Sequence, residues 1–314
     1  MKKTDYDILI CGGGPAGMTA AIYAARAEMK TAILEGTVTG GQAAITDTVE
    51  NYPGFKAIGG FVLTENMREQ AEGLGADIIY EPAVSLDLKG KTKKVITVSK
   101  TYTASAVILA MGASPRRLGL PSEGLLKGRG ISYCATCDGA FYKGKDVIVV
   151  GGGNTAAEDA LYLARLANRV YVVHRRDAFR ADRITAEKII SDKKITVLWD
   201  SVVTELIAEK RLAGAVVKNV KTGMTQTVAA DGLFVAIGQE PATKLLFADG
   251  KPLVKLDENG YILTDEHMST STKGVFAAGD VRVGVLKQIV TACADGAIAA
   301  DAAGKYVMQT CGRK

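Results

Sequence analysis

Residues 7–35 of the sequence read DILICGGGPAGMTAAIYAARAEMKTAILE, and this stretch decides the fold of the chain. The mostly apolar run from Asp7 to Cys11 predicts a buried strand, a glycine turn follows at Gly12, and the small residues from Pro15 to Ala27 predict a helix. An apolar segment from Thr31 to Leu34 predicts a second strand. Strand, glycine turn, helix and strand together indicate a βαβ unit of the Rossmann type.

The same pattern recurs 139 residues later, where residues 146–174 read DVIVVGGGNTAAEDALYLARLANRVYVVH. In each copy the first glycine permits a tight turn, the second lets the backbone approach a pyrophosphate, and the third position allows the helix to pack closely on the strand. The first N–H groups of the helix then face the phosphates. The predicted turn residues are Gly12, Gly14, Pro15, Ala16 and Gly17 in the first copy, and Gly151, Gly153, Asn154, Thr155 and Ala156 in the second.

Glycine-rich turns also occur in loops without ligands, but two copies in a complete strand-turn-helix-strand context favour two nucleotide sites. The first copy ends in Glu35, whose carboxylate would accept hydrogen bonds from the ribose hydroxyls of an NAD or an FAD. The second ends in His174-Arg175-Arg176, with Arg180 four residues further on. Guanidinium groups bind a 2′-phosphate through charge-assisted hydrogen bonds, which favours NADP over NAD there. A solvated basic turn is the alternative.

Composition sets the broad class of the protein. At 314 residues the chain exceeds the usual size of one core, so two domains are expected. Apolar residues make up 47% and charged residues 23%, as in ordinary globular proteins, and five cysteines are too few for a secreted disulfide scaffold. We expect a cytoplasmic protein without a membrane-spanning helix. The modest net charge of +5 gives little support to a nucleic-acid role.

Two cysteines, Cys134 and Cys137, lie between the two glycine turns in the segment CATCD. A Cys-x-x-Cys pair exchanges disulfides at neutral pH because the reduced thiol ionises readily. Half of a zinc site and a pair of buried thiols are the alternatives, and zinc would need two further ligands at suitable spacing. The remaining cysteines and histidines are scattered singly at Cys11, Cys293, Cys311, His174 and His267. No metal site is therefore expected.

A hydride on a nicotinamide must be converted into electrons for a disulfide, and a flavin suits that conversion, so the first turn is expected to hold FAD. With these features the chain resembles the low-molecular-weight (bacterial-type) thioredoxin reductases, two-domain flavoprotein pyridine nucleotide-disulfide oxidoreductases. The resemblance covers nearly the whole chain, including the segments NYPG, CATCD, HRR and GVFAAGDV. It implies further FAD-binding residues: Gly41, Gln42, Asn51, Gly279, Asp280, Lys287, Gln288 and Ile289. The family often has arginine at Lys287, so a planar two-point contact there would be weakened.

The resemblance also implies an α/β fold of two Rossmann-like domains, the second inserted into the first. We expect residues 1–116 and 247–314 to form the FAD-binding domain and residues 117–246 to form the NADPH-binding domain that carries the cysteine pair. The donor and the dithiol then lie in different domains, so the NADPH domain must rotate between half-reactions. The expected hinges are the short crossings at 116–118 and 240–244.

The implied activity is a thioredoxin-disulfide reductase in which electrons pass from NADPH to FAD, to the Cys134/Cys137 disulfide and then to thioredoxin. The resemblance implies that Cys137 faces the flavin and that Cys134 exchanges with the partner. We expect Asp138 to be the acid or base that protonates a leaving thiolate; a turn or cap carboxylate is the other interpretation of Asp138. A homodimer is expected. Alternative functions are a ferredoxin-dependent flavin thioredoxin reductase, a flavin-dependent dithiol oxidase and a non-enzymatic flavin or redox sensor.

Overall fold

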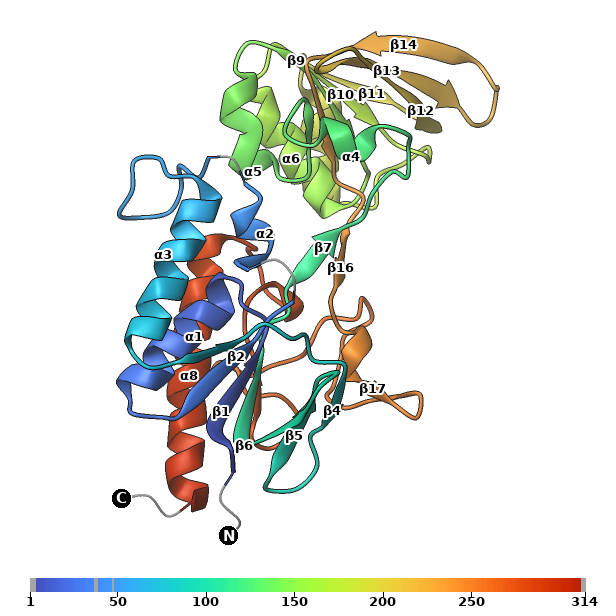
Figure 1. Cartoon of the computed structure of the whole chain (residues 1–314). Helices are drawn as coiled ribbons and strands as arrows, with labels where there is room; N and C mark the ends of the chain where they lie inside the picture. The colour runs from blue at the N-terminus through green and yellow to red at the C-terminus, as the bar shows by residue number, and fades with distance from the viewer. Residues whose placement is uncertain (1–3, 37–38, 47, 312–314) are drawn as a thin grey trace. The chain divides into compact units, whose positions relative to one another are not determined.

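The computed structural model describes residues 4–36, 39–46 and 48–311, without the side chain of Cys311. The chain divides into two compact units, one formed by the residues up to Ser114 together with those from Glu240 onward, the other running from Pro115 to Gln239. Each unit has its own parallel sheet flanked by helices (Figure 1). The predicted α/β class with two Rossmann-like domains is therefore confirmed.

The first unit is built on a sheet in the strand order β3-β2-β1-β6-β5-β4, with β19 also paired to β6. Strands β1, β2, β3, β6 and β19 run parallel, whereas β4, β5 and the start of β6 form an antiparallel meander. The strands span Tyr6–Cys11 (β1), Thr31–Leu34 (β2), Asp77–Ile79 (β3), Ser85–Asp87 (β4), Lys93–Ile96 (β5), Thr101–Leu109 (β6) and Val275–Ala277 (β19), with a small hairpin at Phe247–Ala248 (β17) and Lys251–Pro252 (β18).

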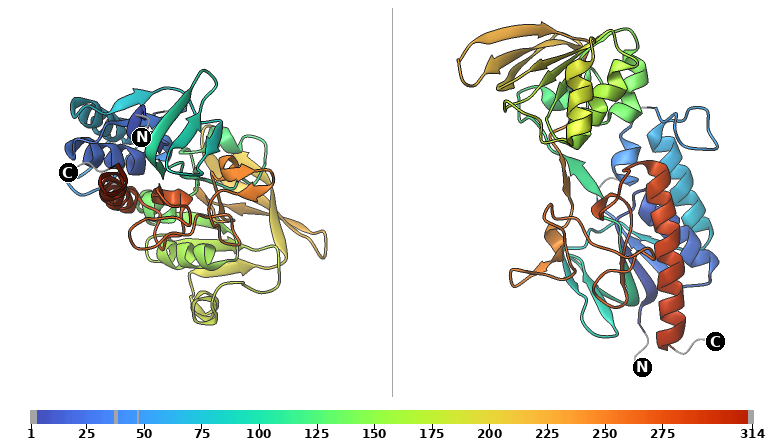
Figure 2. Two further views of the ribbon diagram at one scale, coloured as in Figure 1. Left: turned by 90° about the horizontal axis from the view of Figure 1, so that it is seen from below. Right: turned by 180° about the vertical axis from the view of Figure 1, so that it is seen from behind.

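Helices cover one face of this sheet (Figures 1 and 2). Helix α1 packs against both α3 and α8, and small residues let it approach α8 closely, because a Cβ on Gly296 would overlap the Ala16 carbonyl oxygen. On the other face of the sheet, apolar residues of segment 244–262 and of β19 pack together with strand residues in a second apolar cluster. The helices are α1 (Pro15–Arg26), α2 (Gly41–Ala44), α3 (Gly60–Gly73) and α8 (Ile289–Cys311), with short 3₁₀ turns η2 (Lys244–Leu246) and η3 (Gly279–Val281).

The second unit repeats the arrangement on a smaller scale, with a parallel sheet in the order β11-β10-β9-β15-β8. An antiparallel meander, β12-β13-β14, lies beside it (Figure 1). The strands are β8 (Ile131–Ser132), β9 (Asp146–Val150), β10 (Arg169–Val173), β11 (Ile195–Leu198), β12 (Ser201–Ala208), β13 (Leu212–Asn219), β14 (Thr225–Ala229) and β15 (Gly232–Val235). The helical segments are α4 (Glu123–Leu126), α5 (Ala135–Asp138), η1 (Gly139–Tyr142), α6 (Asn154–Ala164) and α7 (Arg183–Ser191).

The chain crosses between the units twice, at β7 (Ala113–Pro115) and β16 (Gln239–Pro241), which pair with each other. Residues 115–116, which the sequence analysis assigned to the FAD-binding domain, belong to the second unit, and residues 240–246, which it assigned to the inserted domain, belong to the first. The reason is packing: Leu246 is fully buried in the core of the first unit, and the Thr243 hydroxyl donates to the Gly260 carbonyl at 3.0 Å. Among the described helices, none combines the length and the apolar character that a membrane crossing requires.

Candidate functional site

The first glycine turn joins the buried strand β1 to helix α1. Gly12 has φ +106°, and a Cβ there would overlap the Ala110 carbonyl oxygen, while a Cβ on Gly17 would overlap the Gly12 carbonyl oxygen. Gly14, which caps the start of α1, has no atom of the described residues within 4 Å of its Cβ direction. The helix therefore begins at an open position with its first N–H groups available, as an anion-binding turn requires.

Glu35 lies directly after β2 and faces this turn. Its side chain is only 4% exposed, its Oε2 atom has no hydrogen-bond partner among the described residues, and a Cβ on Gly13 would overlap that atom. Burial raises the pKa of Glu35 to about 7, although backbone hydrogen bonds from Gly40 and Gly13 oppose the rise. A buried acceptor without a partner is costly in a protein, and ribose hydroxyls would satisfy it.

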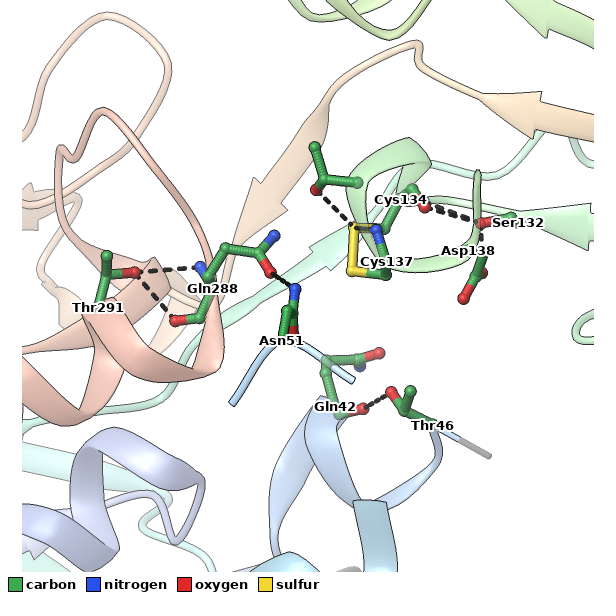
Figure 3. The surroundings of a disulfide bond; sticks show 10 residues. Gln42, Thr46, Asn51, Ser132, Cys134, Cys137, Asp138, Gln288 and Thr291 are labelled. Carbon is green, nitrogen blue, oxygen red and sulfur yellow. Dashed lines mark hydrogen bonds between the residues drawn. A yellow bond between two sulfur atoms is a disulfide. The ribbon is translucent and has the colours of Figure 1, made fainter. Parts of the chain in front are cut away.

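A second part of the first unit gathers polar groups beyond the turn. Asn51 Nδ2 donates to Gln288 Oε1 at 2.9 Å, which joins residues 237 positions apart (Figure 3). Thr291, which the sequence analysis did not select, fixes Gln288, because its hydroxyl accepts from the Gln288 N–H at 3.1 Å and donates to the Gln288 carbonyl at 2.9 Å. Ile289 begins α8 directly after Gln288. These contacts hold the amide side chains of Asn51 and Gln288 side by side.

Helix α2 and the preceding Gly40 lie next to the first glycine turn. Gly40 and Gly41 have φ angles of +90° and +59°, and the Gly40 N–H donates to the Gly13 carbonyl at 3.2 Å. Gln42 follows in α2, where its carbonyl accepts from the Thr46 hydroxyl at 3.4 Å (Figure 3). Two left-handed glycines in succession bring this backbone against the turn, which glycine alone allows without strain.

Asp280 lies in η3, shortly after β19, and its backbone carbonyl is bound by Lys287, which the sequence analysis assigned to FAD. The Lys287 ammonium donates to the Asp280 carbonyl at 2.7 Å and lies 4.1 Å from the centre of the Tyr261 ring. Burial raises the pKa of Asp280 and lowers that of Lys287. Gly279 has φ +74°, and its N–H donates to Asp295 Oδ2 at 3.1 Å. The Lys287 ammonium thus stabilises the turn at Asp280 by binding its backbone carbonyl oxygen.

The second glycine turn has the geometry of the first. Gly151 has φ +154°, and a Cβ there would overlap the Ala236 carbonyl oxygen. In the part of the chain that the structure describes, no atom lies within 4 Å of the Cβ direction of Gly153. Ala156 is fully buried in α6 below the turn. At the start of α6, exposed Thr155 follows Asn154, whose Oδ1 accepts from the Asp182 N–H at 3.0 Å.

His174 stands where Glu35 stands in the first unit. A Cβ on Gly152 would overlap the His174 ring, as one on Gly13 would overlap Glu35. The ring is 4% exposed, its Nε2 lies 3.0 Å from the Ala178 carbonyl, and it stacks on Phe179 at 5.8 Å between ring centres. Trp199 contacts both of these rings edge-on. His174 is therefore part of an aromatic cluster under the turn.

Three arginines follow β10, and all of them are exposed: Arg175, Arg176 and Arg180. The backbone N–H of Arg180 donates to the Gly152 carbonyl at 2.7 Å, which ties the basic loop to the turn. Burial lowers the pKa of His174, and the three guanidinium charges lower it further. The turn thus combines helix N–H groups with a positive field, and His174 stands at the place of Glu35, an arrangement that could bind an anionic ligand.

Cys134 and Cys137 form a disulfide with a Cα–Cα distance of 5.3 Å. Cys134 precedes α5, and its Sγ accepts from the Cys137 N–H at 3.2 Å, so the disulfide is held at the beginning of a helical turn. Asp138 ends α5, and one of its oxygens, Oδ2, lies 2.5 Å from the Ser132 hydroxyl (Figure 3). Cys11 and Cys293 are free thiols, and no cluster of metal-binding side chains is found among the residues of the described ranges.

Comparison with known proteins places these features in a family. The model of the pyridine nucleotide-disulphide oxidoreductase family matches residues 6–296. A thioredoxin reductase of Peptoclostridium acidaminophilum is 47% identical over 309 residues, 96% of this chain and 97% of the relative.

Two solved structures extend the comparison. The thioredoxin reductase of Streptococcus pyogenes is 44% identical and superposes with a TM-score of 0.90 over 97% of this chain and 98% of its own. That of Lactococcus lactis, described as the FR conformation, is 43% identical, with a TM-score of 0.67 over 97% of this chain and 100% of its own. The chain therefore belongs to the pyridine nucleotide-disulphide oxidoreductase family and, within it, to the thioredoxin reductases.

Proposed function

We propose that this chain is an NADPH-dependent thioredoxin-disulfide reductase that contains FAD. The observation that carries the proposal is the Cys134–Cys137 disulfide, which lies in the same unit as a complete second glycine turn and its arginines. A ferredoxin-dependent enzyme or a dithiol oxidase would not need that turn. The family of the chain adds independent support.

We assign FAD to the first unit. The N–H groups at the start of α1 would bind its pyrophosphate, and Glu35 would accept the ribose hydroxyls that its buried Oε2 lacks. When bound, FAD supplies the conversion of hydride reduction by NADPH into reduction of a disulfide. The other proposed FAD-binding residues are Gly12, Pro15, Ala16, Gly17, Gly41, Gln42, Asn51, Gly279, Asp280, Gln288 and Ile289, with Lys287 supporting the Asp280 turn.

We assign NADPH to the second unit. The start of α6, with Gly151, Gly153, Asn154, Thr155 and Ala156, would bind the pyrophosphate, as its open N-terminal turn allows. The guanidinium groups of Arg175, Arg176 and Arg180 would bind the 2′-phosphate. His174 would support this site from below, because its ring is buried under Gly152.

The dithiol would perform the exchange with thioredoxin. The Cys134 thiolate attacks one sulfur of the partner disulfide, a mixed disulfide forms, and one partner thiolate leaves. The Cys137 thiolate then attacks Cys134, which closes the Cys134–Cys137 bond and releases the second partner thiolate. Asp138 is the proposed proton carrier between these sulfurs, because it follows Cys137 directly.

The second unit would change its orientation during turnover, because the disulfide must receive electrons and then meet a protein partner. Solved relatives of nearly equal identity to this chain differ in how well they superpose on it, which supports a movable arrangement. The hinges expected at 116–118 and 240–244 lie next to the crossings β7 and β16. Because Thr243 is buried and bonded to Gly260 in the first unit, we propose that the hinges are residues 113–118 and 239–241. We further propose that the enzyme is a cytoplasmic homodimer, as the family resemblance implies.

A steady-state assay tests the proposal. The purified protein should be yellow, and NADPH, but not NADH, should bleach it and drive the reduction of a purified thioredoxin. Cys134→Ser and Cys137→Ser should each abolish thioredoxin reduction while NADPH still reduces the flavin. Undiminished thioredoxin reduction in both variants would overturn the proposal, and retained colour with NADPH would overturn the NADPH assignment.

A further inference from the structure

Ser132 occupies a fixed position two residues before Cys134. It ends β8, where it pairs in register with Phe234 of the parallel strand β15. The residue is only 3% exposed. A strand of the central sheet therefore determines where its hydroxyl lies, and the short helix α5 brings Asp138 back to the same point.

The Ser132 hydroxyl contacts both ends of the redox loop (Figure 3). Its Oγ lies 2.5 Å from Asp138 Oδ2, a separation typical of a hydrogen bond between a hydroxyl and a carboxylate. The Cys134 N–H donates to the same Oγ at 3.1 Å, and the Cys134 carbonyl oxygen lies 3.3 Å away. One buried hydroxyl thus joins the carboxylate to the backbone of a redox cysteine.

These three contacts match the hydrogen-bonding capacity of a hydroxyl, which has one donor and two acceptor positions. The Cys134 N–H occupies one acceptor position in every case. When Asp138 is a carboxylate, the hydroxyl donates its hydrogen to Oδ2. When Asp138 is protonated, its O–H can donate to the second acceptor position of Oγ, and the Ser132 hydrogen turns to the Cys134 carbonyl.

The geometry points to Ser132 as a positioning residue that holds Asp138 in place in both of its protonation states. This inference rests on the proposed role of Asp138 in dithiol exchange. The reduced pair carries two protons, and both end on the two thiols of the reduced partner. Asp138 takes a proton from the thiol that is about to attack and gives it to the departing partner thiolate, so the carboxyl alternates between its two forms. A partner that can both donate and accept keeps it in one place throughout.

A double-mutant cycle on the flavin-containing enzyme tests this inference. Enzyme that has been fully reduced in advance is mixed with oxidised thioredoxin, and the limiting exchange rate and the half-saturating thioredoxin concentration are measured for Ser132→Ala, Asp138→Asn and the double variant. We expect Asp138→Asn to slow the limiting rate about 100-fold and Ser132→Ala about tenfold, with the half-saturating concentration nearly unchanged. Because Ser132 acts through Asp138, the double variant should stay within about twofold of Asp138→Asn.

Ser201→Ala is the matched control. Ser201 is also buried in the second unit, and its hydroxyl donates to the Trp199 carbonyl at 2.7 Å. Its loss should leave the exchange rate unchanged.

Losses that multiply to about 1000-fold in the double variant would overturn the inference and leave the role of Asp138 intact. An Asp138→Asn enzyme of normal rate would overturn both that role and the inference. Exchange that persists in Cys134→Ser and Cys137→Ser would overturn the proposed function itself.

Discussion

Gly152 offers a sharp test of the second nucleotide turn. The residue is not among the glycines with positive φ, so its backbone conformation is open to other residues, and only space opposes a side chain. The Cβ of Gly152→Ala would overlap the imidazole ring of His174. That ring is buried, stacks on Phe179 and contacts Trp199 edge-on, so moving it would disturb this packing.

The cost of this substitution follows from the packing. Overfilling a well-packed interior costs about 1–3 kcal/mol, and the buried His174 ring would also lose its 3.0 Å contact with the Ala178 carbonyl if it moved. With a urea m-value of about 2 kcal/mol per M, a loss of about 2 kcal/mol lowers the unfolding midpoint by about 1 M. The turn would also be displaced, so the KM for NADPH rises.

Trp199 provides the assay, because it is the only tryptophan of the chain and lies against the His174 ring. Gly152→Ala should shift the Trp199 emission and lower the urea midpoint followed by it. Gly153→Ala is the matched control: it points into open space, so it should raise the KM for NADPH without changing emission or midpoint. Unchanged emission and stability in Gly152→Ala would refute the argument that the ring is locked.

Three further variants extend the account. Without bound nucleotide, burial raises the pKa of Glu35 from 4.5 to about 7. The folded protein is therefore most stable below pH 4.5, where Glu35 is protonated, and it loses this stability as the pH rises through 7. The loss is about 3 kcal/mol, at ~1.36 kcal/mol per pKa unit. Glu35→Gln should abolish this dependence in urea unfolding of flavin-free protein between about pH 5 and about pH 8; an unchanged slope would count against it. Replacing Arg175, Arg176 and Arg180 by Ala should raise the KM for NADPH about 100-fold, with NADH kinetics nearly unaffected. The buried Glu123 carboxylate accepts hydrogen bonds from three backbone N–H groups and one tyrosine hydroxyl. Glu123→Gln should lower the free energy of unfolding by about 2 kcal/mol, as measured by urea unfolding followed by Trp199 emission.

Local patterns made much of the fold predictable. The glycine spacing identified both βαβ units, because a turn that brings strand, helix and phosphate together tolerates only glycine at Gly12 and Gly151. The cysteine spacing alone left a zinc site or buried thiols open, and the two flanking glycine turns favoured a redox pair; Cys134 and Cys137 form a disulfide in the structure. These features act over a few neighbouring residues, so the sequence displays them directly.

Long-range contacts were not predictable in the same way. Thr291 and Asp295 support the predicted residues Gln288 and Gly279, but neither belongs to a motif. The cluster around His174 depends on Trp199, which lies in the turn directly after β11. The role of residues 240–246 follows from the burial of Leu246 in the first unit. In each case tertiary packing decides, and a single sequence does not record it.

The redox state of the cysteine pair tests the central claim most directly. The protein is quenched with a thiol-alkylating reagent in three states: as purified, after NADPH, and after NADPH followed by excess oxidised thioredoxin. The mass of the peptide that contains Cys134 and Cys137 then reports whether the pair is closed. We expect a closed pair in the first state, two alkylated thiols in the second and a closed pair in the third. A pair that stays closed while NADPH reduces thioredoxin would contradict the account.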